Sequence, residues 1–217
     1  MMRQIFIYIE GGGLEGEDDK GTRNARALRK GFDAFFGQLR AVAGEKRIKW
    51  HDVACGPRGQ AYSDFTIGRE SDPQAFHALL VDSEGFVTGP RWQHLRESGK
   101  DKWGKELCQD DENCVHLMVQ AMEAWLIADR KALREFYGEA FKEEKLPDDD
   151  VETIPKEQLL IALRAATRKS DKGTYHKTQH GFDVIAILDV ATVRKAAPHC
   201  EALFHVLEEQ LGIATSQ

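Results

Sequence analysis

Residues 4–13, with the sequence QIFIYIEGGG, constrain the fold of this chain more than any other segment. The run from Gln4 to Ile9 is rich in β-branched and aromatic residues, which predicts a buried strand. The three glycines after Glu10 predict a sharp turn at its end. A second apolar run at residues 75–81, AFHALLV, ends in the same way in the sequence DSEG at residues 82–85. Acids therefore follow two predicted strands at the point where each strand ends.

If these two strands lie side by side and parallel, Glu10, Asp82 and Glu84 meet at the carboxyl edge of the sheet. Ligands of open α/β sheets bind at that edge. Carboxylates packed together repel one another unless a cation neutralises them, and such hard oxygen ligands suit Mg²⁺ or Mn²⁺. The alternative is that Glu10 and Asp82 only cap the turns after two core strands. We expect the three acids to bind a metal ion, because both strands end in the same way.

The glycines after Glu10 also match the dinucleotide fingerprint G-x-G-x-x-G, at Gly11, Gly13 and Gly16. The acids that surround this turn, at Glu10 and residues 15–19, would repel a pyrophosphate rather than bind it. The next predicted strand also lacks the acid that binds the ribose of a dinucleotide. No glycine stands at the required spacing before Gly-Lys-Ser/Thr. The sequence thus excludes both a dinucleotide fingerprint and a P-loop.

Strands and helices alternate along the first two thirds of the chain. We expect a crossover helix at residues 22–43, a strand at 47–54, a short helix through Tyr62 and Phe65, and another buried strand at 114–119. This order predicts an α/β fold with a mostly parallel sheet flanked by helices and a helical C-terminal elaboration. We expect a single domain over residues 1–217, with an α/β core at 1–140 and a helical part with a basic loop at 141–217.

The composition limits the class of protein. The chain has 217 residues, of which 41% are hydrophobic and 30% charged, and its net charge is −6. This acidic balance argues against a protein that coats nucleic acid with its whole surface. No apolar run reaches the roughly 18 residues that a membrane helix needs, no C-x-x-C pair occurs, and a strand is predicted almost at the first residue. We expect a cytoplasmic protein without a signal peptide or a membrane partner.

Basic and aromatic residues gather in two predicted loops. Arg58 lies in the glycine-flanked sequence GPRGQ, and Lys172, Tyr175, Lys177 and His180 crowd the loop after a basic helix end. Such side chains suit contacts with phosphates and bases. A solvated basic loop is an equally good interpretation of the second group, and a surface arginine in a turn is the commoner case for Arg58.

Glu123 lies in the first helical turn after the strand predicted at residues 114–119. From there it can point into the same crevice as the other acids. An acid in a first turn also complements the helix dipole, and the residues alone slightly favour that interpretation.

Six phrases together resemble a bacterial family of unknown function with a Toprim-like fold. They cover nearly the whole chain and read IYIEGGG, LLVDSEG, VHLMVQAMEAWLIADR, CGPRGQAYSDF, ATRKSDKGTYHKTQHGF and ILDVATVRKAAPHCEALF. The resemblance implies metal-dependent phosphodiester chemistry, as in Toprim nucleases, primases and topoisomerases, with Glu10, Asp82 and Glu84 around Mg²⁺. It also implies a partner protein, because such small Toprim proteins are often encoded beside an ABC-type ATPase in phage-defence systems.

The chain departs from the Toprim pattern in two places. Its second acidic motif is Asp-Ser-Glu rather than Asp-x-Asp, and the loop after Gly13 is lengthened by the sequence GEDDK. The acid that would bind a second metal ion is therefore open between Glu15, Glu17 and Glu123.

We expect a metal-dependent nuclease that acts on DNA or RNA, tRNA included, as the toxic effector of a phage-defence system with an ATPase partner. Glu10 would act as metal ligand or general base and Glu123 as a further catalytic acid. Lys177, Arg58 and His180 would hold the phosphate, with Lys172 and Tyr175 as further substrate contacts. The alternatives are a non-catalytic subunit that docks on the ATPase and a phosphotransfer enzyme with a small substrate. A homo-oligomer is also compatible with the sequence.

Overall fold

Four parallel strands form one sheet in the part of the chain that the computed structural model describes, namely residues 3–12, 19–97 and 106–213. The strand order is β2-β1-β3-β4. The strands are β1 (Gln4–Ile9), β2 (Lys49–Ala54), β3 (Phe76–Asp82) and β4 (Val115–Met118). The predicted α/β class and the predicted parallel sheet are therefore confirmed. Each strand lies in the segment that predicted it, except that β3 extends one residue farther, to Asp82.

The two strands that end in acids are neighbours. β1 and β3 pair in parallel, and Ile9 at the end of β1 lies opposite Leu80 in β3. Glu10 therefore follows β1 at the level where β3 also ends, in Asp82. The near-continuous apolar sequence of β3 is typical of a strand that is covered on both faces.

The first crossover consists of two helices rather than the single helix that we predicted at residues 22–43. α1 spans Asp19–Phe35 and α2 spans Gly37–Glu45. The chain bends at Phe36, immediately before Gly37, where the low helix propensity of glycine favours a break. Both helices still bury the predicted apolar face, since Phe32 in α1 and Leu39 in α2 are buried.

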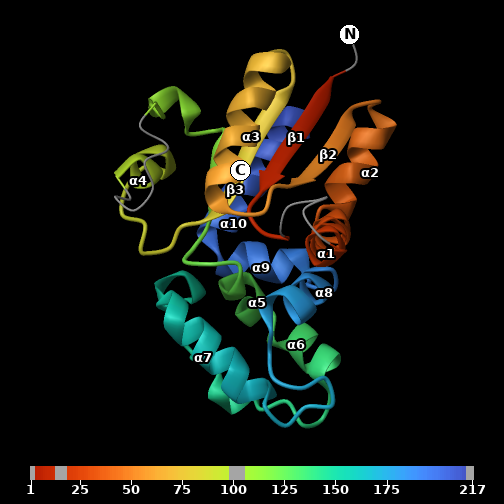
Figure 1. The fold of residues 1–217 in the computed structure, drawn as a ribbon, viewed down its shortest axis with the longest axis vertical. Coiled ribbons are helices and arrows are strands. Elements are labelled where there is room, and N and C mark those ends of the chain that lie inside the picture. Colours follow the sequence, from red (N-terminus) through yellow and green to blue (C-terminus); the bar gives the residue numbers. More distant parts are fainter. Residues whose placement is uncertain (1–2, 13–18, 98–105, 214–217) are drawn as a thin grey trace.

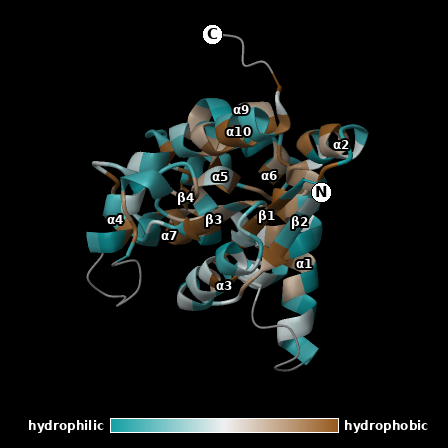
Figure 2. Cartoon of the chain, turned by 90° about the horizontal axis from the view of Figure 1, so that it is seen from above, coloured by the Kyte–Doolittle hydropathy of each residue, from teal (hydrophilic) through white to brown (hydrophobic). Residues whose placement is uncertain are grey.

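Helices cover both faces of the sheet (Figure 2). On one face, α3 (Arg58–Ser71) and α4 (Arg91–Glu97) pack their apolar residues against Tyr8 and Leu79. On the other face, α1 and α10 (Pro198–Leu211) pack against Ile7 and Leu80. The short helix that we predicted through Tyr62 is α3, which is longer than expected, with 14 residues. Figure 2 shows the apolar strands between α3 on one side and α10 on the other.

The remaining helices gather beyond the carboxyl ends of the strands, in the lower half of Figure 1. They are α5 (Glu123–Ala128), α6 (Arg130–Tyr137), α7 (Lys156–Thr167), α8 (Phe182–Ile185) and α9 (Val190–Ala196), with short helical turns at Glu143–Lys145, Val151–Thr153 and Lys177–Gly181. A further short turn, Gln109–Asp111, lies elsewhere, just before the start of β4. Asp129 separates α5 from α6 and accepts a hydrogen bond from the Ala132 N–H at 3.0 Å, as its predicted cap role requires. No described helix is both long and apolar enough to cross a membrane.

The residues after 140 contribute to two layers of the structure. α7 belongs to the helices beyond the strand ends, whereas α10 returns to the sheet. In α10, the Phe204 ring lies 5.6 Å from the Phe35 ring and 5.7 Å from the Phe36 ring, measured between centroids. One apolar core therefore joins the first helices of the chain to the last.

A close helix contact provides a test of this packing. A Cβ atom at Gly31 in α1 would lie 2.5 Å from the Phe182 carbonyl oxygen at the start of α8. We expect Gly31→Ala to lower the free energy of unfolding by roughly 1–3 kcal/mol, because overpacking outweighs the gain in helix propensity. Gly44→Ala in α2 is the control, since a Cβ there has no neighbour within 4 Å. Urea denaturation that finds both variants equally stable would contradict the packing.

Candidate metal centre

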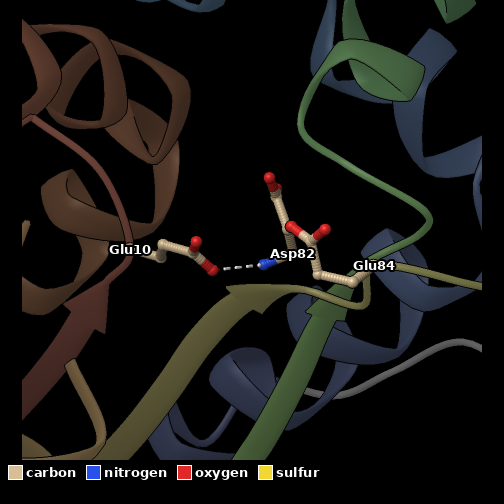
Figure 3. Close-up of side chains that lie close together, drawn as sticks. All are labelled: Glu10, Asp82 and Glu84. Atoms are coloured by element: carbon tan, nitrogen blue, oxygen red, sulfur yellow. Dashed lines mark hydrogen bonds between the residues drawn. The ribbon is translucent and has the colours of Figure 1, made fainter. Parts of the chain in front are cut away.

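Glu10 and Asp82 meet at the carboxyl edge of the sheet. The Glu10 N–H donates to the Leu80 carbonyl at 2.9 Å, which extends the strand pairing one residue beyond β1. The Asp82 N–H in turn donates to Glu10 Oε2 at 3.0 Å, as the dashed line in Figure 3 shows. The predicted convergence of these two acids is therefore confirmed by the strand order and by a direct hydrogen bond.

Glu84 supplies the third carboxylate. Its backbone is left-handed, with φ at 63°, a conformation that is uncommon for residues other than glycine. The turn is held by the Glu84 N–H, which donates to the Gln120 carbonyl at 3.0 Å, and by Ser83 Oγ, which donates to the Gly85 carbonyl at 2.6 Å. One carboxylate oxygen from each of the three acids lies within 4.8 Å of the others (Figure 3).

Arg58 is a buried residue at the start of α3, and not a surface residue in a turn as the commoner case would have it. Its Nη2 donates to the Asp82 carbonyl at 2.7 Å. The same guanidinium lies 3.6 Å from Glu10 Oε2 and 3.5 Å from Glu84 Oε1. Because α3 begins directly after β2, the order of strands and helices brings this cation to the three acids.

Lys177 reaches the site from the loop predicted to be basic. Its Nζ lies 2.9 Å from Asp82 Oδ2 and 3.6 Å from Glu123 Oε2. Burial lowers the pKa of Lys177, but the negative charges of Asp82 and Glu123 outweigh burial and raise its pKa above the ordinary value. Lys177 is thus a charged ammonium group that joins two acids from different strand ends.

Glu123 does face the crevice from the first turn of α5, and its side chain is almost fully buried. The Tyr175 hydroxyl donates to Glu123 Oε1 at 2.9 Å, and the Tyr175 N–H donates to Thr167 Oγ1 at 2.7 Å. Tyr175 is only 2% exposed. The structure therefore places Tyr175 inside the protein, where it holds Glu123, and corrects the prediction that it contacts substrate. Glu15 and Glu17 lie outside the described residues.

Two other predicted substrate contacts pack against α6. Lys172 Nζ lies 4.6 Å from the centre of the Phe136 ring, and His180 Nδ1 lies 3.0 Å from the Tyr137 hydroxyl oxygen. Burial, followed by the charge of His176, lowers the pKa of His180. The loop thus delivers Lys177 to the carboxylates, while Lys172 and His180 contact a different part of the protein.

Lys156 is the site residue that the sequence did not reveal. It is the first residue of α7, and its Nζ lies 3.4 Å from Asp82 Oδ2 and forms an ion pair with Glu84 Oε1. A cation in the first turn of a helix opposes the helix dipole. That unfavourable position is the one local signal that this lysine has a partner elsewhere.

The pKa values of Glu10 and Asp82 are shifted in opposite directions. Burial and the charge of Asp82 raise the pKa of Glu10 to about 7, against the opposing charges of Arg58 and Lys177. Burial also raises the pKa of Asp82, but the ammonium groups of Lys177 and Lys156 outweigh burial and leave its pKa below the ordinary value. Near neutral pH, Asp82 is therefore ionised, while Glu10 holds its proton more strongly than an ordinary glutamate does.

The donor set fits a hard divalent cation. All three ligands are carboxylates, and no thiol or imidazole belongs to the group, which favours Mg²⁺ or Mn²⁺ over Zn²⁺. Glu10, Asp82 and Glu84 would hold such an ion, which would draw their carboxylates closer together than they are here.

The fold and the site define an α/β protein with a carboxylate cluster at the edge of a parallel sheet. The chain belongs to the family described as Domain of unknown function (DUF4276), which matches residues 22–208. No curated protein and no solved structure matches the chain. The family description names no activity, so the function must be argued from the site.

The raised pKa of Glu10 predicts how stability depends on pH. Between pH 4.5 and about 7, folded Glu10 keeps a proton that the unfolded chain has released, so this group lowers the free energy of unfolding as pH rises through that window. Glu10→Gln removes the effect and keeps an oxygen for the Asp82 N–H. In metal-free buffer we expect the variant to gain roughly 1–3 kcal/mol over the wild type between about pH 4 and about pH 8.

Urea denaturation across that pH range, with a chelator present, measures the difference between the two proteins. A constant difference would show that the pKa of Glu10 is the same in the folded and the unfolded protein.

Proposed function

We propose that this protein is a metal-dependent nuclease of the Toprim type, which hydrolyses phosphodiester bonds in DNA or RNA. The observation that supports this most strongly is the convergence of Glu10, Asp82 and Glu84 at one sheet edge, within 4.8 Å of one another. Arg58 and Lys177 lie at the same edge, and cations beside a carboxylate cluster are what a phosphate substrate requires.

The chemistry follows from the positions of these side chains. A bound Mg²⁺ would lower the pKa of a water molecule and stabilise charge on the phosphate. Arg58 and Lys177 bind phosphate oxygens and orient the scissile bond. Glu10 accepts the proton of the attacking water at Oε1, because Oε2 already accepts from the Asp82 N–H.

The charge distribution supports a nucleic acid as the substrate. α7 begins at the carboxylates with Lys156 and carries Arg164 toward its other end, and Arg168 and Lys169 follow the helix directly; the last three residues are exposed. From Lys156 to Thr167 the helix rises by about 17 Å. A row of cations that leads away from a phosphate site fits the backbone of a nucleic acid strand.

The acidic balance of the chain also bears on its regulation. With a net charge of −6, the protein has weak general attraction for nucleic acid. We therefore propose that the isolated chain has low activity and acts with an ATPase partner, as the toxic effector of a phage-defence system. This part of the proposal rests on the Toprim resemblance of the sequence.

The strongest competing function is a non-catalytic subunit that docks on the ATPase. One observation favours it, because Lys156, Lys177 and Arg58 already neutralise much of the carboxylate charge without a metal ion. A structural ion-pair cluster would have the same arrangement. Activity measurements separate the two functions.

Cleavage assays test the nuclease directly. We expect the purified protein to cut plasmid DNA, single-stranded DNA or tRNA slowly with Mn²⁺ and not with a chelator. Asp82→Asn should lower the rate by at least about 100-fold, because loss of a direct metal ligand exceeds the 10–100-fold typical of outer-shell groups. The matched control is Asp52→Asn, which also alters a buried strand carboxylate but one that pairs with Arg40 at 2.8 Å.

Equal cleavage by the wild type and Asp82→Asn would assign the activity to a contaminant. No cleavage of any substrate, together with growth arrest by the Asp82→Asn protein when it is expressed with its partner, would establish the docking subunit in place of the nuclease.

A further inference from the structure

The ammonium group of Lys156 contacts two of the three candidate metal ligands, Asp82 and Glu84. Its Nζ is 3.4 Å from Asp82 Oδ2 and also forms an ion pair with Glu84 Oε1. Both acids belong to the group whose oxygens lie within 4.8 Å of one another. The chain thus supplies its own cation to two of the three candidate metal ligands.

Hydrogen bonds to Gln120 hold the backbones of Lys156 and Glu84 in place without the help of the ion pair between their side chains. Gln120 Oε1 accepts from the Lys156 N–H at 3.2 Å, and the Gln120 carbonyl accepts from the Glu84 N–H at 3.0 Å. The side chains are more accessible, with 28% of the Lys156 side chain and 42% of the Glu84 side chain exposed. Rotation of the Lys156 side chain therefore releases its ammonium group without movement of α7.

Lys177 differs from Lys156 in its second partner. Lys177 joins Asp82 to Glu123, and the side chains of both acids are 1% exposed. Lys156 joins Asp82 to the exposed Glu84. Water screens an exposed ion pair and weakens it, so Lys156 is the cation that leaves more readily.

A divalent ion at these oxygens would repel the Lys156 ammonium group. Lys156 Nζ and Lys177 Nζ already share Asp82 Oδ2, at 3.4 and 2.9 Å. A third cation with two charges would lie within a few ångströms of both, where like charges repel strongly in a partly buried site. The same repulsion would direct a released ammonium group toward an anion that enters with the metal ion. In a phosphodiester substrate that anion is the phosphate.

We propose that Lys156 is a built-in counterion, which holds Asp82 and Glu84 until a divalent metal ion displaces it and then binds a phosphate oxygen of the substrate. This proposal rests on the proposed function and adds a phosphate-binding residue to it. It also assigns the first turn of α7 to the substrate side of the site, in line with the exposed cations farther along the helix.

The test compares metal and phosphate binding in the same variant. Calorimetry with Mn²⁺ alone should show roughly tenfold tighter binding to Lys156→Met than to the wild type, because no ammonium group has to leave. With Mn²⁺ present, thymidine 3′,5′-bisphosphate should bind the variant roughly tenfold more weakly. Lys156→Arg keeps the charge and should restore phosphate binding. Lys131→Met, which removes an exposed ammonium group in α6 that pairs with Glu135, should change neither affinity.

The results separate this inference from the function on which it rests. Unchanged or weaker Mn²⁺ binding by Lys156→Met would show that the lysine does not compete with the metal ion. Unchanged binding of the bisphosphate would remove its phosphate role. Absence of Mn²⁺ binding in the wild type and in every variant would overturn the proposed function itself. If Lys156→Met does not fold by circular dichroism, Lys156→Gln takes its place with the same expected shifts.

Discussion

The site depends on one pairing, that of β1 with β3. Because the two strands are parallel and in contact, the acids that follow them are forced together at the carboxyl edge, where Glu10 accepts a hydrogen bond from the Asp82 N–H. Carboxylates held this closely need cations. The chain supplies Arg58 from α3, Lys156 from α7 and Lys177 from a distant loop. The acid cluster therefore joins the sheet to the helices beyond it, so that the fold and the site are stabilised by the same contacts.

The sequence predicted those parts of the site that depend on local pattern. A strand followed by an acid and glycines is visible at Glu10 and Asp82, and parallel topology then brings the two together. Long-range contacts leave no comparable pattern. Lys156 reaches Glu84 across 72 positions, and Tyr175 gave no sign that its hydroxyl would be buried against Glu123. The helix break at Phe36 was missed for a related reason, because the apolar spacing of residues 22–43 continues through it and only Gly37 marks the bend.

The basic residues at the carboxylates allow two interpretations of the cluster, a metal site and a structural ion-pair cluster. Three basic groups already lie at the carboxylates, so acidic residues at a strand end are not sufficient evidence of a metal site. What distinguishes the two interpretations is how firmly each cation is held. Lys177 bonds two acids whose side chains are almost fully buried, whereas Lys156 bonds an exposed glutamate. A site that keeps one firmly held and one displaceable ammonium group is suited to exchange a cation for a metal ion and a phosphate.

The most direct measurement is anomalous diffraction at the manganese edge from crystals soaked in MnCl₂. If the site binds a metal ion, we expect a single strong anomalous peak between the carboxylates of Glu10, Asp82 and Glu84. We also expect the Lys156 ammonium group to have moved away from Asp82. A map without a peak at that position, in which Lys156 and Lys177 still bond Asp82 in a fully soaked crystal, would show that the acids form a structural ion-pair cluster and would contradict the metal centre.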